Sequence, residues 1–250
     1  MSRNFELLSQ MGKAQVMLHA EAEPQIAPPR EVPIFSPLLE IEGMARDEVT
    51  KLVHRLFLLA GAEGPRRVVF TGTESGNGTT WICAHASEIL ASQVAESVCV
   101  VDCNLRSPAL HEQFGVENHS GLADALRGEG PIRQYAQQLS RPNLWLVTSG
   151  TTPENAQELV TSDRMRIRIS ELRAEFDYVV FDVGALNTCN HGPVLGNLSD
   201  GLVLVLKANS SRRDSTRETI QDLQASNVRV LGAVLNQRTF PIPDEIYNRL

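Results

Sequence analysis

The sequence lacks the features that identify several large classes of protein. It has 4 cysteines among 250 residues, none of them in a C-x-x-C pair or beside a histidine cluster, which excludes a zinc-finger type of site. Its opening residues show no basic segment followed by an apolar run, and no stretch reaches the roughly 18 apolar residues that a membrane span requires. We therefore expect a soluble, cytoplasmic protein with no direct membrane span, whose cysteines are buried as small apolar side chains.

An excess of basic residues is also missing. The chain has 23 Lys and Arg against 30 Asp and Glu, a net charge of −7 and a pI of about 5.4. Proteins that bind nucleic acid or anionic membranes mainly through charge need a basic face. The balance therefore predicts no nucleic-acid partner. The hydrophobic share of 42% is large enough for a substantial core, so a folded domain is expected.

The first 43 residues differ in composition from the rest and predict an N-terminal arm. Residues 4–18 carry apolar side chains at near-helical spacing, which fits a short amphipathic helix or a frayed chain end. Prolines at positions 24, 28, 29, 33 and 37 then indicate an extended linker. A single P-loop-like domain is expected over residues 44–250.

Within residues 44–250, short apolar runs alternate with amphipathic stretches. This alternation indicates βαβ units, and hence an α/β fold with a mostly parallel sheet covered by helices on both faces. The predicted strands are 67–71, 97–102, 144–148, 178–182, 201–206 and 228–235. The predicted helices are 44–59, 80–93, 108–114, 121–127, 162–176, 191–198 and 213–226.

A glycine-rich loop, residues 72–80, joins the first predicted strand to a helix. Backbone N–H groups converge in such a loop, and the helix dipole favours an anion, so the loop predicts a phosphate site. Gly76 and Gly78 supply the torsions that the loop needs. In the P-loop pattern G-x-x-x-x-G-K-[ST], the last glycine is Gly78 and the final Ser/Thr is Thr80, but the lysine position holds Thr79.

The missing lysine has a predictable cost. It normally contacts the β- and γ-phosphates, and a charge-assisted contact of this kind contributes about 1.5–3 kcal/mol to binding. Charge spreads over the transferred group in the transition state, and losing one preorganised donor there typically lowers the rate about 10²–10³-fold. Thr79 therefore predicts weak nucleotide binding and poor catalysis.

Two acids, Asp102 and Asp182, end predicted strands and complete the pattern of a site. Acids at the carboxyl ends of parallel strands point toward the crevice where ligands bind, and two of them beside a phosphate loop fit a Mg²⁺–nucleotide site. A Rossmann dinucleotide site is the rival, because Gly76 and Gly78 begin G-x-G-x-x-G. Its third glycine position holds Trp81, which opposes close helix–strand packing.

The order of these segments resembles the cytoplasmic domain of bacterial tyrosine kinases of the capsular-exopolysaccharide family, within the larger group of MinD- and ParA-type ATPases. In that family the loop ends G-E-G-K-S, the second strand continues D-x-D-x-R-x-P, and the Walker B strand ends in Asp. The corresponding stretches here are residues 76–80, 102–108 and 180–182, and the resemblance spans about residues 46–250. It implies ATP or ADP and Mg²⁺ as weakly held ligands.

The resemblance also implies roles for individual residues. Asp102 and Asp182 match catalytic positions, and Asn236 resembles an adenine-contacting asparagine. The nucleotide-binding residues are then Gly76, Asn77, Gly78, Thr79, Thr80 and Asn236, and the Mg²⁺ ligands are Thr80, Asp102 and Asp182.

Several positions depart from the family pattern. Asn104 replaces the second acid, Glu74 stands at the signature lysine of MinD- and ParA-type proteins, and Val-Gly-Ala at 183–185 replaces Thr-Pro-Pro. The phosphorylated tyrosine cluster is reduced to Tyr247. The E-x-x-R-x-x-R oligomerisation motif is replaced by a stretch that begins at Glu48 and lacks both arginines.

Three interpretations follow from these departures. The first is a degenerate kinase-like protein, a pseudoenzyme that acts as a regulator or scaffold in exopolysaccharide synthesis or export. The second is an active tyrosine kinase in which another cation, such as Arg106 or Lys207, replaces the lysine. The third is a positioning ATPase of the MinD or ParA kind. The resemblance implies an inner-membrane chain-length or export protein as partner, recruitment to the inner face of the membrane, and homo-oligomers.

Overall fold

The computed structural model describes residue 39, residues 43–151 and residues 156–238, which belong to one compact unit, Ile34–Leu250. The helix predicted over residues 4–18 and the proline-rich linker lie outside the described residues. The predicted domain boundary at residue 44 stays a prediction. Among the described helices, none is long and apolar enough to cross a membrane.

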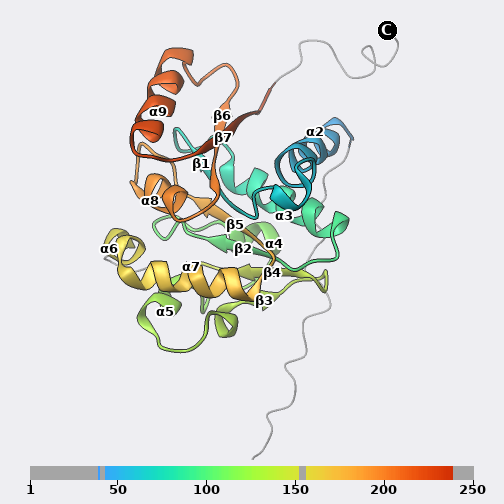
Figure 1. Ribbon diagram of the computed structural model, residues 1–250, viewed down its shortest axis with the longest axis vertical. Coiled ribbons are helices and arrows are strands. Elements are labelled where there is room, and N and C mark those ends of the chain that lie inside the picture. The colour runs from blue at the N-terminus through green and yellow to red at the C-terminus, as the bar shows by residue number, and fades with distance from the viewer. Residues whose placement is uncertain (1–38, 40–42, 152–155, 239–250) are drawn as a thin grey trace, which may run out of the picture. The chain divides into compact units, whose positions relative to one another are not determined.

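A seven-stranded sheet forms the centre of the fold, in the order β3-β4-β2-β5-β1-β6-β7 (Figure 1). All neighbouring pairs are parallel except β3 with β4. The α/β class and the mostly parallel sheet are therefore confirmed, and the six longer strands were predicted to within two residues at each end. The strands are β1 (Arg67–Gly72), β2 (Val98–Asp102), β3 (Gln137–Gln138), β4 (Leu144–Val147), β5 (Tyr178–Val183), β6 (Gly201–Lys207) and β7 (Val230–Asn236).

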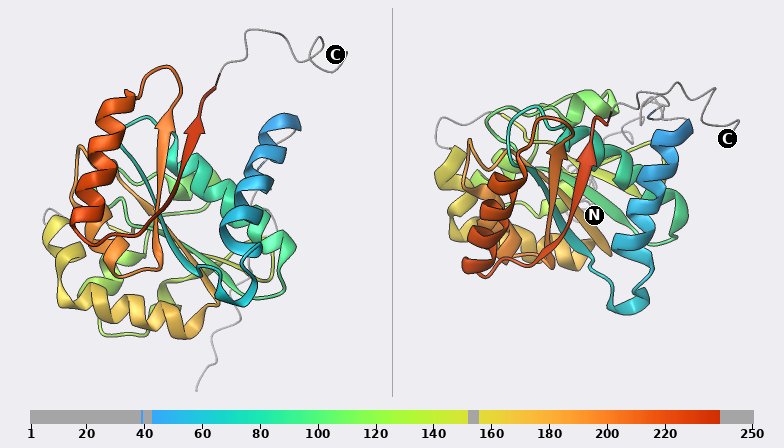
Figure 2. Two further views of the ribbon diagram at one scale, coloured as in Figure 1. Left: turned by 45° about the horizontal axis from the view of Figure 1, so that its top comes forward. Right: turned by 90° about the horizontal axis from the view of Figure 1, so that it is seen from above.

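Helices cover both faces of this sheet (Figures 1 and 2). One face carries α2, α3 and α4, and the other carries α5 to α9. The helices are α2 (Gly43–Val53), α3 (Thr79–Gln93), α4 (Leu110–Phe114), α5 (Leu122–Arg127), α6 (Ala156–Thr161), α7 (Asp163–Glu175), α8 (His191–Asn197) and α9 (Arg213–Ala225). Three shorter turns of helix complete the described chain: η1 (His54–Leu58), η2 (Gly61–Glu63) and η3 (Ile132–Tyr135).

Strand alternation divides the apolar side chains between two cores. In β1, Val68 and Phe70 pack beneath α2 and α3, whereas Val69 packs beneath the helices of the other face. Both sets are fully buried, which is why the strand reads as a continuous apolar run rather than an alternating one. Asp102 and Asp182 continue the first set at the strand ends, so their side chains point toward α3.

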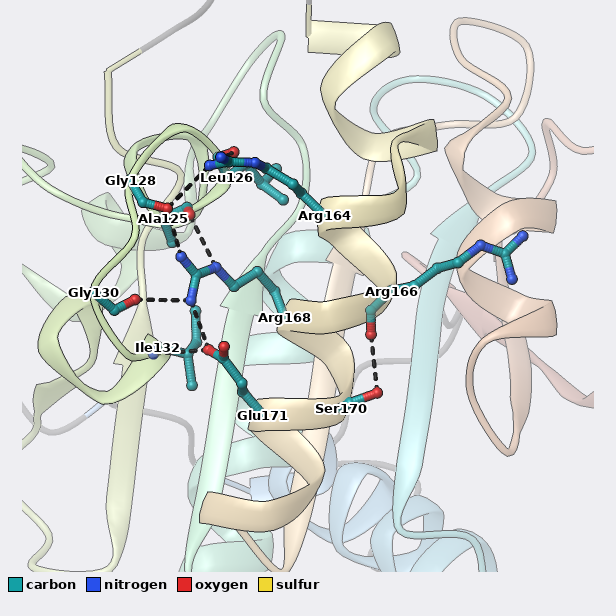
Figure 3. A network of polar contacts seen from close by, with 10 residues as sticks. All are labelled: Ala125, Leu126, Gly128, Gly130, Ile132, Arg164, Arg166, Arg168, Ser170 and Glu171. Atoms are coloured by element: carbon teal, nitrogen blue, oxygen red, sulfur yellow. Dashed lines mark hydrogen bonds and ion pairs between the residues drawn. The ribbon is translucent and has the colours of Figure 1, made fainter.

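Arg168 of α7 is the largest buried cation of the described chain and is 5% exposed. Its guanidinium donates hydrogen bonds to the carbonyls of Ala125, Gly128 and Gly130 and to the Glu171 carboxylate, at 2.7–2.9 Å (Figure 3). We call this set the arginine clamp. Because it binds the Ala125 carbonyl in the last turn of α5 and two carbonyls of the following turn, it fixes α5 against α7.

Four elements were not predicted from the sequence: η2, β3, η3 and α6. Each is at most six residues long. The two residues of β3 are both glutamine and owe their pairing to the neighbouring β4. Such short elements are stabilised by tertiary contacts more than by their own propensity, so they leave little periodic signal.

Candidate functional site

The glycine-rich loop lies at the carboxyl end of β1, between the strand and the first turn of α3 (Figure 1). Gly76 and Gly78 have φ of 84° and 81°, which only glycine adopts without strain. A β-carbon on Gly78 would also collide with the side-chain amide of Asn236. Both glycines are therefore required by the local backbone, as the sequence indicated.

Side-chain hydrogen bonds hold the carbonyl side of the loop. Asn236 donates to the Asn77 carbonyl at 3.0 Å, and Gln237 donates to the Gly76 carbonyl at 3.1 Å. The buried Asn77 amide in turn donates to the Val205 carbonyl at 2.9 Å. Hydrogen bonds with residues of β6 and at the end of β7 thus hold the loop through its carbonyl groups and the Asn77 side chain.

The N–H side of the loop is left open. The backbone N–H groups of Gly76 and Gly78 make no hydrogen bond within the part of the chain that the structure describes. The first N–H groups of α3 have no carbonyl partner inside the helix, as in any helix start. Bound carbonyls and free donors on one curved segment make a cradle for an anion.

Asp102 and Asp182 lie side by side on β2 and β5, where they are direct register partners. Burial is the first cause that raises their pKa values, to about 6 for Asp102 and about 8 for Asp182. The neighbouring Asp102 raises the pKa of Asp182 further, and a hydrogen bond with the Thr80 side chain opposes the rise. Among the described residues, Asp182 Oδ2 has no hydrogen-bond partner although it is buried.

The two acids differ in how they are held. Asp102 accepts the backbone N–H of Asn104 at 3.0 Å and that of Leu110 at 3.1 Å, so it anchors the turn after β2 and the start of α4. Among the described residues, no backbone N–H group donates to Asp182, and its Oδ2 atom has no hydrogen-bond partner. A buried carboxyl group without a donor is stabilised by a bound proton or by a cation, and Asp182 with Thr80 offers oxygen atoms of the kind that Mg²⁺ prefers.

The two basic residues considered as substitutes for the lysine do not contact the loop in the part of the chain that the structure describes. Thr79, at the lysine position, turns its Oγ1 toward Gly72, to 3.0 Å from where a β-carbon of Gly72 would stand. Arg106 and Lys207 are both exposed, and within the described chain neither makes a hydrogen bond or ion pair with the loop. The structure thus gathers the predicted loop, Thr80, Asp102, Asp182 and Asn236 at one edge of the sheet, and neither Arg106 nor Lys207 pairs with them among the described residues.

Asn104 occupies the position of the second acid. Its side-chain amide donates to the Ser107 carbonyl at 2.7 Å, so it closes the turn after β2. The Rossmann alternative is wrong, because β5 separates β2 from β1 and Asp102 therefore does not adjoin the loop strand. Gln237, which the sequence analysis did not single out, is the additional loop contact. Its left-handed backbone, φ of 55°, leaves no signal in a polar stretch after a strand.

Comparison with known families agrees with this arrangement. The family model described as "Cellulose biosynthesis protein BcsQ" matches residues 66–215, which include the loop and both acids. Tyrosine-protein kinase YwqD of Bacillus subtilis (strain 168) is 29% identical over 171 residues, covering 68% of this chain and 72% of YwqD. Longer relatives that are also named tyrosine-protein kinases are matched over 23% of their own length. The resemblance to bacterial tyrosine kinases is therefore confirmed.

Solved structures confirm the fold. The chimerical protein CapA2B2 superposes with a TM-score of 0.73 at 21% identity, over 80% of this chain and 87% of that chain. The septum site-determining protein MinD of Pyrococcus horikoshii OT3, solved with Mg-ADP, gives a TM-score of 0.57 at 19% identity, over 74% and 76% of the two chains. P-loop proteins of this fold thus include one that binds ADP and Mg²⁺.

Proposed function

This chain belongs to the family described as cellulose biosynthesis protein BcsQ, and from this premise we propose that it is a P-loop protein of bacterial exopolysaccharide production with weak nucleotide binding and little or no turnover. Its proposed role is that of a regulator or scaffold rather than a catalyst. The observation that carries the proposal is a buried, unpartnered Asp182 oxygen beside a phosphate cradle whose lysine position holds Thr79.

The residues at this edge fit a Mg²⁺–nucleotide in part. Thr80 and Asp182 would hold the metal, with Asp102 behind them, and the backbone of residues 76–80 would hold the phosphates. A bound Mg²⁺–ATP supplies a transferable phosphoryl group whose charge the metal partly neutralises. Thr79 adds no positive charge, so the transition state loses the contact that a lysine provides.

Asn236 and Asn104 limit the site further. The Asn236 amide, proposed from resemblance to contact adenine, donates a hydrogen bond to the Asn77 carbonyl and so supports the loop. Asn104 uses its amide to close a turn and brings no negative charge to a metal. Positioning of the metal and of an attacking group therefore rests on Asp182 and Thr80, which is a small set for phosphoryl transfer.

A second candidate is an active protein-tyrosine kinase, which the names of the relatives favour. It requires a cation to reach the cradle, from Arg106, Lys207 or a second molecule. The positioning-ATPase alternative is supported by the likeness of the fold to MinD, but no particular residue of the chain favours it.

Turnover by the purified full chain separates the candidates. We expect ATP hydrolysis and tyrosine phosphorylation to stay at the level of the Asp182→Ala variant, with Mg²⁺ present. Robust turnover that Asp182→Ala abolishes would establish the kinase or ATPase instead. Thr79→Ala is the matched control, because it changes the lysine position without touching the acids.

The proposed partner is a membrane-embedded chain-length or export protein, with self-association of the chain as a second contact. This follows from the relatives by analogy. Affinity capture from native membranes with the tagged full chain should recover such a component. Normal polysaccharide output in a deletion strain, together with no membrane component captured, would contradict the proposal.

A further inference from the structure

The two edges of the sheet differ in length and in chemistry. The strand order places β3 at one edge and β7 at the other. β3 has two residues, Gln137 and Gln138, whose side chains donate to the carbonyls of Glu117 and Pro142 at 3.3 and 2.7 Å. β7 runs for seven residues, Val-Leu-Gly-Ala-Val-Leu-Asn, with no charged residue and no proline. Folded proteins commonly prevent their edges from pairing with other molecules by short edge strands, edge charges or proline, so β3 is protected in this way and β7 is not.

The outer edge of β7 is open over most of its length. A bulge at the start of the strand leaves Gly232–Asn236 in regular parallel register with β6. Apart from this ladder, the backbone of residues 232–235 makes no hydrogen bond in the part of the chain that the structure describes. At Gly232, no described atom lies within 4 Å of where a β-carbon would stand. The outward N–H and C=O groups of this stretch are therefore available to a further strand.

Both faces of the sheet are hollowed beside this edge. On one face, a groove of about 950 Å³ separates α2 from β7 and is lined by Leu52 and Val234 among others. On the other face, a hollow of about 660 Å³ lies against α9, where Ile220 and Leu235 line it. Figure 2 shows β7 at the sheet edge between these two helices. Successive side chains of a strand point to opposite faces, so a strand added beside β7 would place its side chains alternately over the two hollows.

The β7 strand of a second molecule matches these requirements. It is apolar on both faces and already extended, so little conformational entropy is lost when it pairs. An antiparallel pair centred on Val234 puts Ala233 of each copy opposite Leu235 of the other, and both residues are exposed in the single chain. Like charges directly opposite each other would destabilise such a pair, and Gly232–Asn236 contains none.

We propose that the chain self-associates through β7, with Gly232–Asn236 paired antiparallel to the same residues of a second copy. The two sheets then continue into each other across a two-fold axis, and the protected β3 edges end the assembly at two copies. The inference assigns a surface to the self-association proposed above and is independent of nucleotide binding. The paired stretch has no aromatic anchor and no ion pair, so we expect a dissociation constant on the order of 1–100 μM.

Sedimentation of the full chain with two matched variants of Ala233 tests the surface. Because Ala233 is exposed, the single chain accommodates either a lysine or a valine there. Ala233→Lys places a charge opposite Leu235 in both halves of the pair and should raise the dissociation constant at least about tenfold. Ala233→Val keeps the position apolar and favours a strand, so it should leave the dissociation constant unchanged or lower it.

Two results of this experiment would overturn the proposal, and they differ in what else they contradict. A chain that stays monomeric up to its solubility limit would contradict self-association as such. An oligomer that Ala233→Lys leaves unchanged would contradict the β7 surface alone, because the copies would then meet elsewhere. Thermal unfolding of the Ala233→Lys chain shows whether a loss of the dimer reflects the edge or a loss of the fold.

Disulfide trapping between two differently marked chains gives a second readout that needs no charge in the strand. Ala233→Cys and Leu235→Cys chains are mixed, both in a Cys189→Ser background; the three remaining native cysteines are fully buried. On mild oxidation, the mixed disulfide should form at least about tenfold faster than between Ala233→Cys and Leu59→Cys, a control position that is 74% exposed. Equal rates would show that the copies have no fixed pairing at β7. A protected Ala233→Cys thiol in a monomeric chain would assign the edge to another segment of the same molecule and overturn the proposal.

Discussion

Arg168 and Asp182 are both buried charged residues, but their surroundings differ. Arg168 makes four hydrogen bonds at 2.7–2.9 Å, three to carbonyls and one to Glu171 (Figure 3). Asp182 leaves one oxygen without any partner in the described chain. A satisfied buried charge stabilises the fold that surrounds it, whereas an unsatisfied one marks a place that another molecule completes.

The two residues also lie in different parts of the fold, one in a helix and the other at the end of a central strand. The arginine clamp joins α5 to α7, which are distant in sequence from the loop at residues 72–80. The acids lie at the carboxyl edge, where ligands bind in open parallel sheets. Changes at the clamp should therefore alter stability alone, and changes at the acids should alter stability, its pH dependence and ligand binding together.

Removal of the clamp should have the largest effect. Arg168→Ala leaves the carbonyls of Ala125 and Gly130 without their donor and Glu171 without its charge partner, so we expect a loss of about 3–5 kcal/mol in the free energy of unfolding. Urea denaturation measures it. Arg166→Ala, on the exposed side of the same helix, should cost less than about 1 kcal/mol. Similar losses for both variants would contradict the claim that the buried Arg168 stabilises the fold more than an exposed arginine of the same helix does.

Replacement of the unsatisfied acid should have the opposite sign. Because burial raises the pKa of Asp182 to about 8, the folded form binds a proton more tightly than the unfolded form, whose aspartates titrate near 4. The charged Asp182 therefore costs stability that grows as the pH rises from about 4 to about 8. Asp182→Asn should unfold at higher temperature than the wild type at pH 8 and at a similar temperature at pH 4.

The expected gain of Asp182→Asn at pH 8 exceeds about 1.4 kcal/mol, the value of a single pKa unit. Asp102→Asn is the control, because Asp102 accepts two backbone N–H groups and an amide has only one accepting atom. It should be neutral or destabilising. A loss of stability at pH 8 in Asp182→Asn would show that the folded chain already satisfies Asp182.

Shortening Gln237, whose side chain supports the glycine-rich loop, should have the smallest effect on stability. Gln237→Asn keeps a residue that tolerates the left-handed backbone but shortens the side chain that reaches the Gly76 carbonyl. Loss of this hydrogen bond should cost about 1 kcal/mol in thermal unfolding. Gln221→Asn, on α9 and away from the loop, should cost less than about 0.5 kcal/mol. An unchanged melting temperature for Gln237→Asn would show that the Gln237 side chain does not stabilise the loop.

The sequence predicted the long elements and the edge at which the site lies. The buried strands read as unbroken apolar runs, and the acids stand at their ends, so sheet class and site position followed from β2 and β5 together. It did not predict the order that puts β5 between β1 and β2, because that order depends on packing between segments distant in the chain. The Rossmann rival survived for that reason until the structure excluded it.

Individual side-chain contacts could not be predicted from the sequence as the long elements could. Arg168 is one of several arginines on α7, and nothing in its local pattern distinguishes it from exposed Arg166. Asn236 was selected from resemblance to an adenine contact, which stays a prediction, and its hydrogen bond to the Asn77 carbonyl was not foreseen. Gln237 has no sequence signal at all. Roles that depend on which carbonyl a side chain reaches require the folded geometry.

The most direct test compares ATP affinity of the wild type and Thr79→Lys by calorimetric titration with Mg²⁺ present. The loop keeps its free N–H groups, and its Asp182–Thr80 pair remains in place, so a lysine at position 79 adds the missing charge to an existing cradle. We predict an affinity gain of about five- to a hundredfold, or about 1–3 kcal/mol, without full catalysis. Unchanged affinity would contradict the account, because it would mean that this loop is not a phosphate site.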